Sequence, residues 1–280
     1  MKTLLSSLAI LGTLATAAQA QVYLSEDFSY ANGRLADNSS GNWTIHSSGA
    51  TALNVAGGAA VINQGDGLSG HEDALHLLKS GGSAVSFAPD ANASSTDNLL
   101  FARFTVKFGA LPSGTTGSYF AHFATDSATP PTVFYDRIGA STANAAAGSF
   151  RIGVGNGTWA ATSAQFPQDL QVGVQYTVVT GFNLDTKVGT LWVNPTTEAS
   201  TSVVGTDTIA TFTGKVNAFA LRQGTTGTPT QGPGIIEVDN LVVGRSFTDV
   251  TAVPEPASAA AVVGLGLAGF SLWRRKQAKA

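Results

Sequence analysis

Hydrophobic and polar residues alternate along much of the chain, and the clearest example is the segment 101–108. Every second residue there is apolar, namely Ala102, Phe104, Val106 and Phe108. Successive side chains of a β-strand point to opposite faces, so this pattern predicts a strand with one face in a core and the other in water.

Further strands are predicted along the rest of the body. Period-two patterns cover 149–154 and 216–222, and the segments 176–182 and 189–194 flank a short loop that is typical of a β-hairpin. Glycine-rich turns separate these stretches, and no long helical period occurs before Ala257. The pattern therefore predicts an all-β sandwich.

The two ends of the chain follow a different pattern. Lys2 precedes an apolar run, and Ala18-Gln19-Ala20 matches the small-x-small site of signal peptidases, which predicts cleavage between Ala20 and Gln21. Near the other end, 257–273 is uncharged and is followed by the basic run 274–276. We expect one transmembrane helix there, with the basic residues in the cytoplasm and the body outside.

The order Val253-Pro254-Glu255-Pro256, apolar segment and basic cluster resembles the PEP-CTERM sorting signal of exported proteins in Gram-negative bacteria that make exopolysaccharide. The resemblance implies an exosortase as partner, processing near the Pro-Glu-Pro motif, and a final location at the cell surface or in the extracellular matrix. A permanent anchor is the alternative. We divide the chain into a signal peptide (1–20), a β-sandwich domain (21–251) and a sorting segment (252–280).

Composition limits the chemistry that the body can carry. The chain has no cysteine, so disulfides and thiolate metal sites are excluded. The formal net charge is −3, and without the cations of both ends and Glu255 the body carries about −7. Because nucleic acid and anionic membrane surfaces require clustered cations, this charge argues against both as partners of the body.

Several phrases of the body resemble concanavalin A-like, or LamG-like, jelly-roll domains, which many PEP-CTERM proteins carry. These phrases are 26–30, 43–44, 176–179, 191–195 and 238–243. The resemblance implies a jelly roll whose first and last strands pair, which would bring Glu26 and Asp27 near Asp239. Relatives of the fold bind carbohydrate or protein, some through calcium, and a minority hydrolyse glycans.

A catalytic site is not evident in the sequence. Glu237 and Asp239 share one strand face, but Leu241 and Val242 stand where hydrolases of this fold normally carry a third acid. His71 and His76 are five residues apart, which does not match the spacing of a zinc-binding helix. We therefore predict no catalytic residue and no cofactor, except a structural calcium ion at Asp27 and Asp239.

Carbohydrate binding would use aromatic faces and planar polar groups. The candidates are Trp43, Tyr119 and Trp159 with Arg103, Asp136 and Arg151. Each could equally be a packed core residue or a solvated strand residue. The predicted function is a non-enzymatic exported protein that binds extracellular polysaccharide or another surface component; the alternatives are a diverged glycan hydrolase or lyase and a purely structural matrix protein.

The calcium prediction is tested by thermal unfolding. Because an ion that binds only the folded state adds about 2.7 kcal/mol at a hundredfold excess over Kd, millimolar calcium should raise the melting temperature. Asp239→Asn should abolish that rise and leave the calcium-free melting temperature nearly unchanged. Identical melting curves with calcium and with chelator would contradict the prediction.

The sorting prediction is tested by replacing Pro254, Glu255 and Pro256 with alanine. The body should fold as before, because the motif lies outside it, but full-length protein should accumulate in the membrane. Immunoblots of membrane and medium fractions from a host with an exosortase measure this. If variant and parent have the same size and location, the segment is a simple anchor.

Overall fold

The computed structural model describes residues 20–64, 71–90, 98–125, 133–160, 163–209, 212, 214–223, 232 and 234–252. Most of the predicted signal peptide and all of the predicted transmembrane helix lie outside these residues. Within the described part of the chain, no helix is long and apolar enough to cross a membrane.

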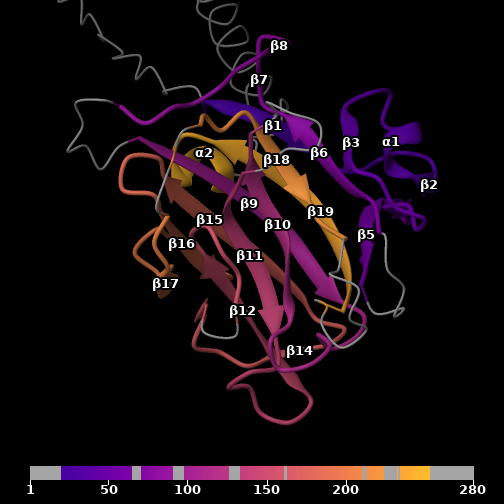
Figure 1. Cartoon of the computed structure of the whole chain (residues 1–280), viewed down its shortest axis with the longest axis vertical. Helices are drawn as coiled ribbons and strands as arrows, with labels where there is room; N and C mark the ends of the chain where they lie inside the picture. The colour runs from indigo at the N-terminus through magenta and orange to yellow at the C-terminus, as the bar shows by residue number, and fades with distance from the viewer. Residues whose placement is uncertain are drawn as a thin grey trace, which may run out of the picture.

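Two β-sheets form the body, and this confirms the predicted all-β sandwich (Figure 1). The described residues of the larger sheet form nine strands, β1 (Val22–Glu26), β2 (Gly33–Arg34), β4 (Asn54–Ala56), β5 (Ala59–Asn63), β9 (Leu99–Phe108), β15 (Gln175–Asn183), β16 (Val188–Val193), β17 (Ser202–Val204) and β19 (Ile235–Gly244). Those of the smaller sheet form eight, β3 (Trp43–Ser47), β6 (Asp73–Leu77), β10 (Ser118–Ala124), β11 (Phe134–Ser141), β12 (Ser149–Gly155), β13 (Ala164–Gln165), β14 (Leu170–Gln171) and β18 (Ala218–Leu221).

Three smaller pieces complete the described secondary structure. The strands β7 (Lys79–Ser80) and β8 (Ser83–Ala84) pair only with each other, as a ribbon beside the sandwich. The two helices are α1 (Leu35–Asn38) and α2 (Phe247–Thr251).

Strands that are distant in sequence lie side by side in both sheets. The order is β17-β16-β15-β9-β19-β5-β4-β2 in the nine-stranded sheet, where β1 also pairs with β19, and β13-β12-β11-β10-β18-β6-β3 in the eight-stranded sheet, where β14 pairs with β12. The predicted hairpin is confirmed as β15 and β16. The β1–β19 pairing places Glu26 opposite Leu241, which confirms that the first and last strands of the body pair.

A layer of phenylalanine rings fills the space between the sheets. We call Phe104, Phe108, Phe120, Phe123, Phe150 and Phe219 the phenylalanine layer; all six are fully buried. Phe108 of the larger sheet approaches Phe150 of the smaller one with ring centroids 4.2 Å apart, and Phe104 lies 5.9 Å from Phe219. Because the chain has no disulfide, this apolar contact carries the stability of the sandwich.

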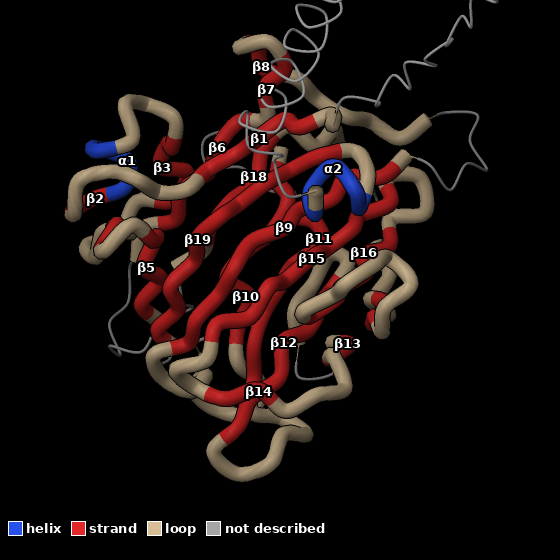
Figure 2. Tube along the Cα trace, turned by 180° about the vertical axis from the view of Figure 1, so that it is seen from behind, coloured by secondary structure: helices blue, strands red, loops and turns tan. Residues whose placement is uncertain are grey.

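The outer face of the nine-stranded sheet has an apolar cover at one end, where α2 packs (Figure 2). Phe247 and Val250 of the helix join Phe101, Val179 and Trp192 in a second buried cluster. A capping box of Ser246 and Asp249 fixes the start of the helix. The predicted wet face of β9 is therefore partly covered.

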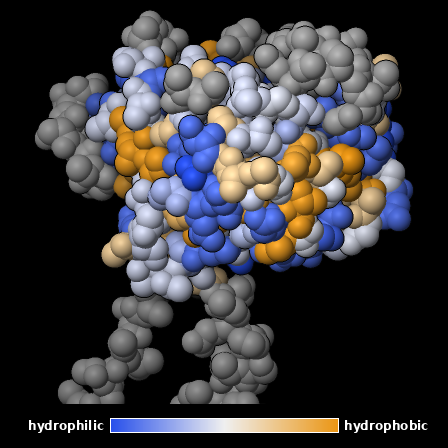
Figure 3. All heavy atoms as spheres, turned by 90° about the horizontal axis from the view of Figure 1, so that it is seen from below, coloured by the Kyte–Doolittle hydropathy of each residue, from blue (hydrophilic) through white to orange (hydrophobic). Residues whose placement is uncertain are grey.

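Other large hydrophobic side chains on the surface are scattered. The exposed ones among the described residues are Val22, Leu111, Val172, Val174, Val204 and Ile235. Viewed from below, hydrophobic patches of the surface are separated by hydrophilic residues (Figure 3). Scattered apolar residues of this kind are normal for a protein surface.

The carboxyl group of Asp136 lies inside the sandwich. Asp136 of β11 is fully buried, and its Oδ2 accepts a hydrogen bond from Thr180 Oγ1 of β15 at 2.7 Å. Its Oδ1 faces Gly189 so closely that a Cβ atom at Gly189 would collide with it. Burial raises the pKa of Asp136 to about 7. Because it lies between the sheets, Asp136 cannot contact a sugar at the surface, as its place among the carbohydrate-binding candidates would require.

The raised pKa of Asp136 predicts a pH dependence of stability. Below about pH 3 the group is protonated in both states and does not lower the stability. As pH rises from there towards 7, the unfolded state loses its proton and the folded state keeps it, so stability falls. Asp136→Asn should remove this loss. The free energy of unfolding of the parent, relative to the variant, should fall by roughly 2 to 3 kcal/mol between about pH 5 and pH 8.5.

Urea unfolding of parent and variant at several pH values measures this difference. Comparing the two proteins cancels the titration of all other groups. A difference that stays constant with pH would contradict the buried position of this carboxyl.

Candidate functional site

Charged and aromatic side chains gather on the outer face of the eight-stranded sheet. We call this group the cationic cluster; its members are His46, Tyr119, His122, Phe134, Arg137 and Arg222. They come from or adjoin four strands, β3, β10, β11 and β18. Leu75, Ala124, Ala218 and Ala220 form an apolar patch on the same sheet, which Phe134 also contacts.

Two guanidinium groups share one tyrosine ring in this cluster. The Arg222 guanidinium lies 4.3 Å from the centroid of the Tyr119 ring, and that of Arg137 lies 4.7 Å from it. Arg222 Nη1 also donates a hydrogen bond to Ser118 Oγ at 2.9 Å. Among the described residues, no carboxylate forms a salt bridge with either arginine. The cations are therefore held by cation–π contacts and a neutral hydrogen bond.

Burial affects the titration of one of the two arginines. It lowers the pKa of Arg137, and the Arg222 guanidinium adds to the decrease. Arg137 Nε has no hydrogen-bond partner in the described part of the chain. A half-buried cation next to another cation is unfavourable unless an anion offsets both.

Two histidines lie beneath these groups. His122 is fully buried, with its ring centroid 4.5 Å from that of Phe134 and 5.6 Å from that of Tyr119. Burial holds the pKa of His122 well below its usual range, and the nearby cations lower it further, so the ring is neutral at neutral pH. Burial also lowers the pKa of His46, whose ring centroid lies 6.1 Å from that of His122.

The histidine nitrogens are poorly satisfied by the protein. Nδ1 of His122 lies 3.2 Å from the carbonyl oxygen of Phe123, to which a neutral ring can only donate. Nε2 of His122 then carries a lone pair, and it has no hydrogen-bond partner among the described residues. Neither ring nitrogen of His46 has one there either. Buried polar atoms without partners in the protein are rare, and a water molecule, an ion or a ligand can satisfy them.

A β-bulge places Tyr119 and His122 on the same face of the sheet. Residues three apart in a regular strand point to opposite sides. The pairing of β10 with β11 shifts register between Tyr119 and Ala121, and again between Ala121 and Phe123. As a result, Phe120 and Phe123 both enter the core, and Tyr119 and His122 both point outward.

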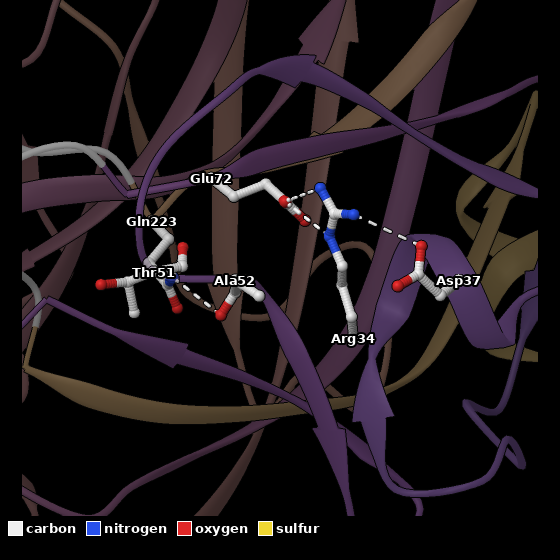
Figure 4. Close-up of polar contacts among 6 residues, drawn as sticks. All are labelled: Arg34, Asp37, Thr51, Ala52, Glu72 and Gln223. Carbon is white, nitrogen blue, oxygen red and sulfur yellow. Dashed lines mark hydrogen bonds and ion pairs between the residues drawn. The ribbon is translucent and has the colours of Figure 1, made fainter.

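A polar network fixes the chain around Arg222, and Figure 4 shows the part of it that joins Gln223 to Thr51 and Ala52. Gln223 donates its backbone N–H to Asp73 Oδ1 at 2.7 Å and its side-chain amide to the carbonyl oxygens of Thr51 and Ala52. Gln64 Nε2 donates to the carbonyl oxygen of Arg222 itself at 2.9 Å. These bonds hold the backbone that presents the Arg222 side chain.

The same network includes the ion pair of Arg34 with Glu72, of which only the Glu72 carboxylate is buried. Arg34 donates from Nε and Nη2 to Glu72 Oε2, at 2.9 and 2.6 Å, and approaches Asp37 more loosely at 3.4 Å. Glu72 precedes Asp73 and is almost fully buried. The Arg34 pair therefore anchors the segment that holds Gln223.

The structure separates the sequence-predicted sugar-binding residues into three groups. Tyr119, Trp159 and Arg151 lie on the outer face of the eight-stranded sheet, where Trp159 packs against Gly139 and Arg151 pairs with Asp169 at 2.7 Å. Arg103 lies in the other sheet. Trp43 is buried, with Nε1 donating to Glu26 Oε2 at 2.9 Å, so its ring packs in the core.

Residues predicted to hold calcium lie at the corner where β1 meets β19. The carboxylates of Asp27 and Glu26 contribute to a raised pKa of Asp239, after burial, so the three groups are electrostatically coupled. Each is also bonded locally: Glu26 accepts from Phe28 N–H, and Asp239 from Asn240 N–H. In the described chain, no group of three or more histidine or acidic side chains is arranged to hold a metal ion. Calcium binding stays a prediction.

This corner also contains a pocket of about 380 Å³ between β1, β9, β19 and α2. Glu26, Asp27, Arg103, Asn240 and Asp249 line it together with apolar residues. Ala20 and Ala252, at the two limits of the described body, line it too, so the predicted signal cleavage site between Ala20 and Gln21 lies close to the start of the sorting segment.

The remaining sequence-predicted groups occupy ordinary structural positions. Glu237 is exposed on β19 and pairs with Lys107 at 3.2 Å, while Leu241 is buried in the core. His76 lies in β6 and His71 in an isolated bridge, not on a helix.

Sequence reasoning missed five members of the cationic cluster: His46, His122, Phe134, Arg137 and Arg222. They are spread over 177 positions of chain numbering, from 46 to 222, so no local motif contains them. The segment 119–123 carries an irregular hydrophobic pattern that could have indicated a bulge. Only the strand order brings the two arginines to one ring.

Comparisons with solved structures give low similarities. An alginate lyase from Pseudomonas aeruginosa is 12% identical, with 73% of this chain and 98% of the other covered and a TM-score of 0.43. A family 7 alginate lyase from Zobellia galactanivorans is 14% identical (72% and 94% covered, TM-score 0.40), and peanut lectin is 11% identical (72% and 90% covered, TM-score 0.40). These values carry no conclusion about activity. No curated protein matches in sequence.

The C-terminal residues give a specific match. Residues 252–276 match the model of the PEP-CTERM protein-sorting motif. The match covers Val253, Pro254, Glu255 and Pro256 together with the apolar segment and the basic run that follow. The chain therefore carries a PEP-CTERM sorting signal, as the order of its C-terminal residues predicted, and this signal identifies it as an exported protein of the kind that an exosortase processes.

Proposed function

We propose that the protein is a non-enzymatic component of the cell surface or extracellular matrix whose sandwich binds extracellular polysaccharide through the outer face of the eight-stranded sheet. One observation carries the proposal: Arg137 and Arg222 stack on Tyr119 above two histidines with unsatisfied ring nitrogens. Planar donors and aromatic rings on one face are groups that sugar rings and hydroxyls bind.

The position of these groups supports ligand binding over a purely structural role. Tyr119, Arg137 and Arg222 are all partly exposed, while the histidines beneath them are buried. The cationic cluster does not contribute to the sandwich core, which the phenylalanine layer fills on the inner side of the sheet. A purely structural matrix protein would gain nothing from holding two unpaired cations there.

An enzyme is the second candidate, and His122 favours it. Its neutral ring has a lone pair on Nε2 beside two guanidinium groups. A base beside groups that neutralise a carboxylate is suited to proton abstraction next to that carboxylate, which is the first step of glycan cleavage by a lyase. Full burial of His122 argues against direct access to a polymer.

The proposal is tested on a glycan array with the purified full chain in mild detergent. We expect binding that Tyr119→Ala reduces at least tenfold, because the ring holds both arginines, and that Tyr119→Phe, which keeps the ring, reduces less than threefold. Each array is run with and without calcium.

Assays for new reducing ends and for unsaturated sugar ends follow on every polymer that binds. Binding without cleavage supports the proposed function. Cleavage that is lost in His122→Gln would establish the lyase instead, and no binding to any glycan would leave the structural matrix protein as the function.

A further inference from the structure

We propose that the cationic cluster is a subsite for the carboxylate of an acidic polysaccharide, a chain of uronic acid residues, with Arg137 and Arg222 as the groups that bind it. The inference rests on the proposed function, since it names the chemical class of the glycan. It follows from the charges, the donors and the aromatic rings of the cluster.

The two arginines of the cluster have no carboxylate as counter-charge within the described residues. Elsewhere on the sandwich, Arg34 is paired with Glu72 and Arg151 with Asp169. Arg137 and Arg222 form no salt bridge within the described residues, although their guanidinium groups lie on one ring. Two cations this close repel each other, and a bound anion would reverse that cost. The body is otherwise negatively charged, so this pairing of cations is locally exceptional.

The guanidinium groups of the two arginines have a geometry that suits a carboxylate. A guanidinium is a planar fork that matches the two oxygens of a carboxylate. Tyr119 fixes the planes of both forks, and Ser118 Oγ holds one Nη atom of Arg222. The remaining N–H groups are thus restrained before a ligand binds, which reduces the entropy lost on binding.

An apolar surface in the cluster favours a sugar acid over an inorganic anion. The neutral histidines add no positive charge, and the ring of Phe134, which is partly exposed beside Arg137, is an apolar surface. An inorganic anion has no apolar face to pack against this ring, whereas the C–H face of a sugar ring has one. Anion-binding arginines beside a partly exposed aromatic ring correspond to the carboxylate and the sugar ring of one uronic acid residue.

The test measures binding of the full chain in mild detergent to polygalacturonate, polyglucuronate and alginate, at about 150 mM salt to limit long-range electrostatics. Each polymer is compared with its carboxyl-reduced form, which has the same linkages and hydroxyls but no charge. Dextran sulfate serves as a polyanion without carboxylates.

Three variants that each remove one positive charge are compared. Arg137→Gln and Arg222→Gln alter the proposed subsite, and Arg151→Gln removes a paired arginine from the same face of the same sheet. We expect at least one polyuronate to bind, its reduced form to bind at least tenfold more weakly, and the first two variants to lose at least tenfold in affinity. Arg151→Gln should stay within twofold of the parent.

Melting temperatures show whether each variant folds. If a glutamine variant unfolds, Arg137→Lys and Arg222→Lys replace it in the binding test, because they keep the charge but lose the planar fork of the guanidinium. Their affinity for the polyuronate should then fall at least threefold.

Other outcomes overturn the inference in distinguishable ways. Equal binding of a polyuronate and its reduced form, with loss in Tyr119→Ala, would keep the proposed function and reject the carboxylate. Equal losses in all three arginine variants would indicate diffuse charge, and tighter binding of dextran sulfate would indicate a sulfate site. Failure of every polymer, charged and neutral, would reject the proposed function as well.

Discussion

The phenylalanine layer between the two sheets determines which side chains reach the outer faces. Phe120 and Phe123 of β10 both insert into it, although residues three apart normally face opposite ways. The bulges in β10 resolve this conflict by shifting the register against β11. Burying two phenylalanines is worth several kcal/mol, enough to fix an irregular strand. Tyr119 and His122 share the outer face as a direct consequence.

The cationic cluster lowers the stability of the folded state, and other contacts of the protein have to offset this loss. Arg137 is half-buried beside a second cation, and His122 has a buried nitrogen without a partner in the described chain. Each such group typically costs about 1 to 3 kcal/mol. The support comes from neighbouring polar contacts, since Gln223 and Gln64 hold the backbone of Arg222 through four hydrogen bonds to side chains or carbonyls. A sandwich optimised only for stability would carry apolar or paired residues there.

Much of the fold could be predicted because it depends on local patterns. The alternation in 101–108 gave the position and the buried face of β9 correctly, and all four inward residues are fully buried. The pairing of the first and last strands, inferred from resemblance, is confirmed as β1 with β19. The sorting signal was equally accessible, because its parts follow one another in the sequence.

The candidate site could be predicted only in part because it is assembled from distant segments. Tyr119 was selected as an aromatic candidate, but nothing near it in sequence indicates Arg222, which arrives through the pairing of β10 with β18. Trp43 and Asp136 were candidates by residue type alone, and burial removes both from the surface. Periodicity also fails at a bulge, where the conformation is set by core packing and not by the local sequence.

The charge of the body is consistent with short-range recognition of an acidic polymer. A body of about −7 repels a polyanion at a distance, but at physiological salt this repulsion is screened beyond roughly 8 Å. Within contact distance, the two guanidinium groups on Tyr119 dominate the local field. A protein with an overall positive surface would adhere along the whole length of such a polymer without selectivity. Two cations in an otherwise negative surface restrict attachment to one orientation, which suits an exported protein that must occupy a defined place in a charged matrix.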